Sequence, residues 1–422
     1  MENYIVKGDF CYSESKSKLK SVKNGYLVIQ KDKIAGLFEN LPKKYKDLPI
    51  KDYSNSLIIP GLSDLHIHAP QYQYRGLWMD LELLEWLQAH TFPEEAKYKD
   101  INYADIAYSI FVSDLIKTPT TRLSAFGTLH KDSTLLLMKK LSEVGFCGYI
   151  GKVNMDRNSP DILREDTIQS ARDTISFIEE SSDIKNIKPI ITPRFIPSCT
   201  DSLLTELGKI AKEYNLPVQS HLSENISEIK WVKELVPESK CYADAYKLFN
   251  LWGTTPTVMA HCTWSDKFDK EYMDMPNIFI AHCPDSNVNL TSGVAAARYY
   301  LYKGVDIGLG TDVAGGTSPY LTRTITDAIR DSKLRKRLLD DEEASLTFPE
   351  AFYLASIGGG FFFGKVGSFE EGFDADFSVL DERGIESTLE REFTIEERLE
   401  RYCYLSGEKP VLHKTIKGRE IL

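Results

Sequence analysis

Six of the eight histidines in this chain follow short apolar runs that have the composition of buried β-strands. They are His66, His68, His130, His221, His261 and His282. His66 and His68 are two residues apart, so both side chains point to one face if this segment is a strand. Imidazole and carboxylate groups are the ligands that Zn²⁺ and similar ions prefer. The pair therefore indicates a metal site, provided that further ligands reach it.

Two such ligands come from distant parts of the sequence. His221 and Asp312 each follow another apolar run. Together with His66 and His68 they would supply three nitrogens and one oxygen and leave a place for water. A second metal would need a bridging group, such as a modified lysine, after the fourth apolar run, but Arg194 stands there. We therefore expect one ion per chain, Zn²⁺ or alternatively Fe²⁺.

A carboxylate follows one of these ligands closely. Glu224 comes three residues after His221. A carboxylate beside a water activated by a metal can take its proton and pass it to a leaving nitrogen. We expect Glu224 to carry the proton, with His261 and Asp312 orienting the water and sharing its proton. For His282 the sequence leaves two interpretations open, a residue that supports the ligands or a core histidine. The histidines expected to be structural or exposed are His90, His130 and His413.

The middle of the chain alternates apolar, β-branched runs with stretches of helical spacing. The runs are 57–59, 122–125, 148–150, 189–191, 217–219, 257–259, 278–280 and 305–308. Eight buried strands are the number that a closed (β/α)₈ barrel needs, and such barrels gather functional groups at the carboxyl ends of their strands. The alternative is an open doubly wound sheet, but no glycine-rich phosphate loop follows the first run. The pattern favours the barrel.

Both ends of the chain have a different pattern, of short strands separated by turns. The expected strands are 4–6, 25–29, 34–37, 376–380 and 410–412. The two termini therefore belong to one small β domain, residues 1–58 and 365–422, which flanks a barrel of residues 59–364.

Composition limits the partners and the compartment. A formal net charge of −11 argues against binding to nucleic acid or to an anionic membrane surface. The sequence has neither a secretory signal pattern nor an apolar stretch long enough to cross a bilayer. The seven cysteines are an odd number and are scattered, which is typical of reduced thiols in a cytoplasmic protein.

The motifs resemble those of the amidohydrolase superfamily in its single-metal deaminase branch. The residues that carry the resemblance are Pro60-Gly61-Leu62-Ser63-Asp64-Leu65-His66-Ile67-His68, His221-x-x-Glu224, His261-Cys262 and Gly310-Thr311-Asp312. Further segments are similar to the members of this branch that act on guanine, and they extend over nearly the whole barrel. They are residues 68–72, 84–87, 91–93, 151–156, 193–195, 219–225 and 308–316. The flanking strands resemble the small β-sandwich of that family.

The resemblance implies hydrolysis of guanine to xanthine and ammonia by a homodimer. It implies a Zn²⁺ site formed by His66, His68, His221 and Asp312. It implies catalysis by Glu224, His261 and Asp312. It implies a substrate pocket formed by His68, Gln71, Arg194, Phe195, His221, Glu224 and Asp312.

The residue types in this pocket suit a purine. A fixed guanidinium, as in Arg194, can satisfy the carbonyl oxygen at C6 of guanine. Gln71 can both donate and accept hydrogen bonds, and Phe195 offers an apolar face to the ring. The metal ligands do not distinguish guanine from another amino-substituted ring, such as a pterin, a triazine or a cytosine-like base, which is the alternative substrate class. An inactive barrel that serves as a scaffold is the alternative of a different kind, although the full ligand set argues against it. No P-C-x-x-C run is present, which excludes the zinc deaminases of the cytidine type.

Overall fold

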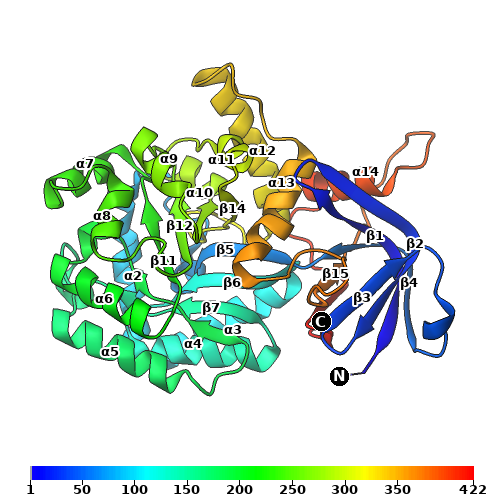
Figure 1. Ribbon diagram of the computed structural model, residues 1–422, viewed down its shortest axis with the longest axis horizontal. Coiled ribbons are helices and arrows are strands. Elements are labelled where there is room, and N and C mark those ends of the chain that lie inside the picture. Colours follow the sequence, from blue (N-terminus) through cyan, green and yellow to red (C-terminus); the bar gives the residue numbers. More distant parts are fainter. Residues whose placement is uncertain (1) are drawn as a thin grey trace.

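A parallel β-barrel forms the larger part of the computed structural model, which describes residues 2–422 (Figure 1). Its first four strands pair in chain order: β5 (Leu62–His68), β6 (Thr120–Phe126), β7 (Cys147–Gly151) and β9 (Ile187–Pro189). The second four do the same: β11 (Val218–Leu222), β12 (Thr257–His261), β13 (Ile278–His282) and β14 (Asp306–Leu309). The short strands β8 (Val153–Asn154) and β10 (Thr192–Pro193) pair with each other beyond the ends of β7 and β9.

Backbone hydrogen bonds join the two four-stranded sheets at both edges. Ile191, just after β9, bridges to Val218 of β11. At the other edge, the Asp312 N–H donates to the His66 carbonyl at 2.8 Å, and the His68 N–H donates to the Val313 carbonyl at 3.1 Å. The sheet is therefore closed, and the predicted (β/α)₈ barrel is confirmed.

Helices surround the barrel (Figure 1). They are α1 (Leu83–Trp86), α2 (Phe92–Ala96), α3 (Ile101–Lys117), α4 (Lys131–Val144), α5 (Thr167–Glu180), α6 (Asp201–Glu213), α7 (Ile226–Leu235), α8 (Tyr242–Leu248), α9 (Lys267–Met273), α10 (Pro284–Asn289), α11 (Ala297–Lys303), α12 (Leu321–Leu338) and α13 (Phe348–Tyr353). In α6 the Thr200 side chain accepts a hydrogen bond from the Leu203 N–H and so caps the first turn. The largest buried cluster joins strand residues such as Leu123 and Ile280 to helix residues such as Leu207. This core sits between strands and helices, which leaves the strand ends available for a site.

The two ends of the chain build one seven-stranded sheet beside the barrel. Its order is β17 (Arg419–Glu420), β16 (His413–Ile416), β15 (Phe377–Val379), β4 (Ile50–Pro60), β1 (Tyr4–Ser15), β2 (Lys18–Gln30) and β3 (Lys33–Phe38). β4 joins the two contributions, because it pairs with β1 on one side and with β15 on the other. Helix α14 (Ile395–Leu405) packs against β1 and α12. The expected small β domain from both termini is therefore present.

Two strand predictions were wrong. Residues 57–59 belong to β4 of the small sheet, and the first barrel strand is β5. The two strands are separated only by Gly61, so one nearly continuous apolar run serves both domains. A side chain does not fit at Gly61, because its Cβ would lie 2.1 Å from the Thr121 Oγ1 atom. Residues 410–412 are not a strand, and β16 begins at His413. The other seven runs of the middle overlap barrel strands, and the domain boundaries at 58/59 and 364/365 stay a prediction.

Buried charges connect the small sheet to the barrel. The guanidinium of Arg122, on β6, donates to Asp374 at 2.7 Å and lies 2.9 Å from Asp376. The ammonium of Lys414, on β16, donates to the carbonyls of Leu115 and Thr120. These contacts fix the small sheet against one side of the barrel.

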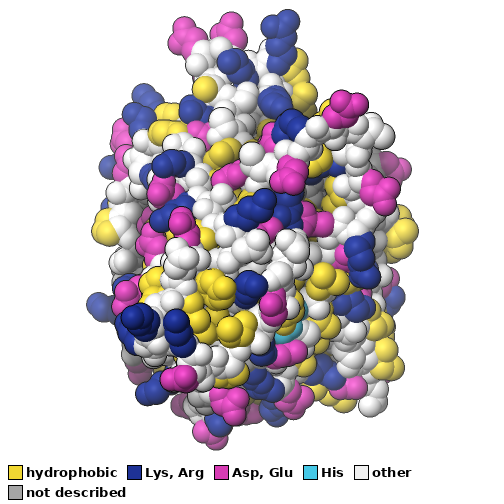
Figure 2. Space-filling model, turned by 90° about the vertical axis from the view of Figure 1, so that its right-hand side faces the viewer, with side chains coloured by type: hydrophobic (Ala, Val, Ile, Leu, Met, Phe, Trp, Pro, Cys, Tyr) yellow, Lys and Arg dark blue, Asp and Glu magenta, His cyan; other side chains and the backbone are white. Residues whose placement is uncertain are grey.

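The surface of the small sheet mixes both signs of charge. On the face that Figure 2 shows, Lys and Arg side chains are interspersed with Asp and Glu side chains rather than gathered in one basic patch. Among the helices of residues 2–422, none combines the length and the apolar character needed to cross a bilayer.

Candidate active site

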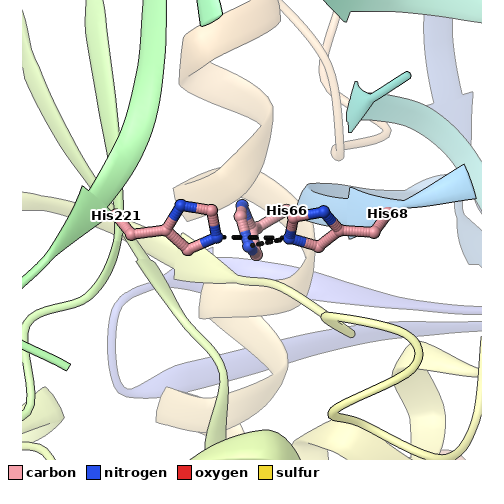
Figure 3. Close-up of side chains that lie close together, drawn as sticks. All are labelled: His66, His68 and His221. Atoms are coloured by element: carbon pink, nitrogen blue, oxygen red, sulfur yellow. Dashed lines mark hydrogen bonds between the residues drawn. The ribbon is translucent and has the colours of Figure 1, made fainter. Parts of the chain in front are cut away.

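Three histidines and one aspartate converge at the carboxyl ends of the barrel strands. His66 and His68 extend from the end of β5, His221 from β11, and Asp312 from the loop after β14. Nε2 of His68 lies 3.2 Å from Nε2 of both His66 and His221 (Figure 3). Oδ1 of Asp312 lies 3.2 Å from Nε2 of His66 and 3.4 Å from Nε2 of His68. The structure thus brings the four predicted ligands together. Two overlapping groups lie close enough to hold a metal ion, and the second includes His261: His66, His68 and His221, and His66, His261 and Asp312.

The protonation of these groups suits a cation. The Arg194 carbonyl lies 2.6 Å from Nδ1 of His221, which places the ring proton on Nδ1 and leaves the lone pair of Nε2 facing the cluster. Burial, together with the neighbouring histidines, lowers the pKa of His68 and of His221. Burial opposes ionisation of Asp312, but the charge and hydrogen bond of His66 and the charge of His261 hold the pKa of that carboxyl below its usual range. Neutral imidazoles at His68 and His221 and an ionised carboxylate at Asp312 are the forms that bind metals.

Asp64 fixes the loop that carries Asp312. Its carboxylate accepts hydrogen bonds from the Thr311 N–H at 3.0 Å, the Thr311 hydroxyl at 2.5 Å and the His66 N–H at 3.2 Å. Asp312 itself has a φ of 46°, a left-handed backbone that a non-glycine residue adopts at some cost. The hydrogen bonds of Asp64 therefore hold a strained segment in the conformation that directs Asp312 at the histidines.

Glu224 lies beside this cluster, between β11 and α7. It is only 3% exposed, and its Oε1 atom accepts a hydrogen bond from the Ser292 hydroxyl at 3.1 Å. Its Oε2 atom lies 3.4 Å from Nε2 of His261. Burial, reinforced by the charge of Asp312, raises the pKa of Glu224 to about 8. A carboxyl group with its pKa near neutrality can both accept and release a proton.

His261 faces Glu224 and Asp312 with one ring nitrogen. Its Nδ1 atom pairs with Oδ1 of Asn287 at 2.8 Å, so the Nδ1 proton points to Asn287. The opposite nitrogen, Nε2, lies 3.7 Å from Oδ2 of Asp312. Asn287 therefore selects the tautomer of His261, a role for which the sequence carried no signal.

The remaining histidines lie outside the ligand cluster. His282 is buried, and burial lowers its pKa to about 3, so it is neutral. Its backbone carbonyl accepts from the Gly310 N–H, which makes it a structural neighbour of the Asp312 loop. His90 stacks on Trp78 with ring centroids 4.0 Å apart, and His413 lies in the small sheet.

A partly enclosed cavity opens over the cluster. Its polar lining consists of His68, Gln71, Arg194, His221, Glu224, His261 and Asp312. Its apolar lining includes Phe195, Leu83, Trp86, Leu87 and Leu290. A mostly apolar pocket with a few convergent polar groups is typical of a small-molecule site. The sequence predicted the polar lining residues and Phe195. Leu83 and Leu290 had no signal beyond their hydrophobic character.

Gln71 and Arg194 share a partner for which the sequence carries no signal. The carboxylate of Glu95, on α2, accepts hydrogen bonds from Arg194 Nη1 at 2.7 Å and Nη2 at 3.2 Å. It also accepts from Gln71 Nε2 at 2.8 Å. In the sequence, Glu95 looks like any acidic residue in the first turn of a helix, where it is usually exposed.

Known proteins are similar to this chain over most or all of its length. Residues 57–421 match the model of the amidohydrolase family. The guanine deaminase of Dictyostelium discoideum is 34% identical over 99% of this chain and 98% of its own length, and that of Mus musculus is 37% identical over 91% and 87%. The solved guanine deaminase from C. acetobutylicum, with guanine bound in its active site, has a TM-score of 0.96 and 44% identity and covers 100% of both chains. The three relatives named here are guanine deaminases, and the chain belongs to the amidohydrolase family.

Proposed function

We propose that this protein hydrolyses guanine to xanthine and ammonia. The observation that carries the proposal is that Gln71 and Arg194 line the same cavity as the His/Asp cluster and Glu224. Recognition groups for a purine edge thus lie beside groups for hydrolysis. The similarity to the C. acetobutylicum enzyme, which holds guanine in its active site, supports the same substrate here.

The proposed cofactor is one Zn²⁺ ion, with Fe²⁺ as the alternative. Three imidazole nitrogens and a carboxylate oxygen lie close together, and the Nε2 lone pair of His221 is directed at the others. This donor set fits a borderline divalent ion better than Mg²⁺ or Ca²⁺, which prefer oxygen. When bound, such an ion supplies Lewis acidity that lowers the pKa of a water molecule. His66, His68, His221 and Asp312 would hold it.

The side chains of the cavity divide the remaining work. Arg194 would donate to the carbonyl oxygen at C6, Gln71 would pair with a mixed edge of the base, and Phe195 would cover one ring face. Glu224 would take a proton from the attacking water and deliver it to the amino nitrogen at C2, so that the C–N bond breaks and ammonia leaves. His261 would orient the water, because its Nε2 atom faces both Glu224 and Asp312.

An absorbance assay for conversion of guanine to xanthine, with ammonia release and elemental analysis on the same preparation, tests the proposal. We expect turnover, stoichiometric metal, and loss of activity after treatment with a chelator. A panel that includes a pterin, a triazine and cytosine should show guanine to have the highest kcat/KM, since unpaired donors in a hydrogen-bonding pocket reject a mismatched ring. A metal-loaded protein with no turnover of guanine would refute it.

We further propose that the protein is a cytoplasmic homodimer. All seven cysteines are free and buried, which supports a reducing compartment. Sedimentation velocity should give twice the mass of the chain, and a single species at the mass of the monomer would contradict the dimer.

A further inference from the structure

Glu95 stands behind the two residues that recognise the base. It is only 3% exposed and does not line the cavity. It lies on α2, which follows α1 and its cavity-lining residue Trp86 in the chain. Its two oxygens accept three hydrogen bonds, two from Arg194 and one from Gln71. One carboxylate therefore connects both recognition side chains.

These contacts fix which way the Gln71 amide faces. Its Nε2 atom donates to Glu95, and its Oε1 atom accepts from the Ala314 N–H at 3.2 Å. If the amide were flipped, its oxygen would face the Glu95 carboxylate and its NH₂ group would face the Ala314 N–H. Both contacts would be repulsive, so a single orientation is allowed. That orientation leaves one N–H and one oxygen lone pair of Gln71 for a ligand.

Glu95 also fixes and neutralises Arg194. The paired carboxylate takes up N–H groups from both terminal nitrogens of the guanidinium, which also lies over the Phe92 ring at 5.1 Å. The remaining donors are left for a ligand. Arginine does not lose its proton in proteins, so its buried positive charge needs this carboxylate as a counter-charge. The part of the cavity lining formed by Gln71 and Arg194 is consequently rigid and close to electrically neutral.

We propose that Glu95 is a positioning residue that sets specificity for a neutral ring with a carbonyl acceptor facing Arg194. The inference rests on the proposed deamination of guanine. Glu95 acts through Arg194 and Gln71: it holds their donors in one pattern, and it removes the charge that would otherwise attract anionic rings, including the deprotonated product xanthine.

The isosteric variant Glu95→Gln tests both proposed effects of Glu95, the fixed donor pattern and the neutralised charge. The new NH₂ group must face a donor of Arg194 or Gln71, so the pattern is disturbed while the volume is kept. We expect kcat/KM for guanine to fall about tenfold to a hundredfold, mainly through KM, with unchanged metal content. The ratio of kcat/KM for guanine to kcat/KM for 2-aminopurine, which lacks the carbonyl, should decrease because Arg194 is free to turn away.

The charge gives a readout that simple structural damage would not produce. With Arg194 uncompensated, the affinity of Glu95→Gln for xanthine, measured by calorimetry, should rise with pH as xanthine loses a proton. The wild type should show no such rise. The second variant, Glu95→Asp, keeps the charge but is too short to hold both partners, so KM should rise without the change in xanthine binding.

Glu350→Gln is the matched control, because Glu350 is equally buried and forms a comparable two-bonded pair with Arg298 away from the cavity. Its KM and xanthine profile should be those of the wild type. Wild-type KM, substrate discrimination and xanthine profile in Glu95→Gln would overturn the inference. Calorimetry does not depend on turnover, so absence of guanine turnover by the wild type would refute the proposed function separately.

Discussion

Glu224 has a surrounding that suits the transfer of a proton. It lies between the Ser292 hydroxyl and Nε2 of His261, and burial raises its pKa to about 8. Glu224→Gln keeps the size and the hydrogen bonding but cannot carry a proton. We expect metal content to be retained and kcat to fall by about 10²–10⁴. Elemental analysis and steady-state kinetics on one preparation measure both.

The control for this variant is Glu234→Gln, an exposed position on α7, which should leave kcat unchanged. Turnover by Glu224→Gln at a near-normal rate would remove Glu224 from the mechanism.

The sequence predicted those site residues whose chemistry shows in their type and spacing. His66 and His68 share a strand face, and His221 and Asp312 follow other strands, so parallel strands necessarily bring them to the same end of a barrel. Glu95 had no such signal. Its contacts join it to Gln71 and Arg194, which are 24 and 99 residues away, and only tertiary packing creates them.

Helix α12 carries a buried carboxyl group at an unfavourable position. Asp331 is 6% exposed and its Oδ2 atom has no hydrogen-bond partner in the described chain. Burial, together with the charges of Asp327 and Asp285, raises its pKa to about 8. In the unfolded chain the same group ionises near pH 4. Folding therefore favours the protonated form, and stability is lost as pH rises from about 4 to about 8.

Asp331→Asn removes this penalty. We expect its Tm to exceed that of the wild type by a margin that grows between about pH 5 and about pH 9. Thermal unfolding followed by circular dichroism at both pH values measures the margin. Asp341→Asn, in the exposed loop after α12, should show no such trend. A margin that does not depend on pH would show that Asp331 ionises normally in the folded protein.

Helices were predictable where the apolar residues keep a regular helical spacing over several turns. The apolar residues of 201–214 and 225–236 have helical spacing in the sequence, and these residues form α6 and α7 in the structure. The error at residues 57–59 has a physical origin. A strand buried in the small sheet and a strand buried in the barrel have the same composition, and Gly61 is the only break between them. Composition alone cannot assign such a run to one sheet.

The ligand cluster lies where the barrel closes. β5 and the loop after β14 meet at the closing edge, and His221 arrives from β11 in the second four-stranded sheet. A bound ion would therefore connect segments more than 200 residues apart in the chain, between His66 and Asp312. Any ligand that binds only the folded state stabilises it, by about 2.7 kcal/mol at a hundredfold excess over Kd.

Removal of the metal should consequently lower the Tm of the entire barrel as well as abolish activity. Without an ion, buried imidazole nitrogens and the Asp312 carboxylate face one another with no cation to share. We expect dialysis against a chelator to lower Tm by several degrees, as about 1–3 kcal/mol would in a chain of this size. Addition of Zn²⁺ should restore Tm and activity together, and a chelator already saturated with Zn²⁺ should have no effect. If Tm stayed constant while activity disappeared, the ion would be bound as tightly by the unfolded chain, or the four side chains would not be its ligands.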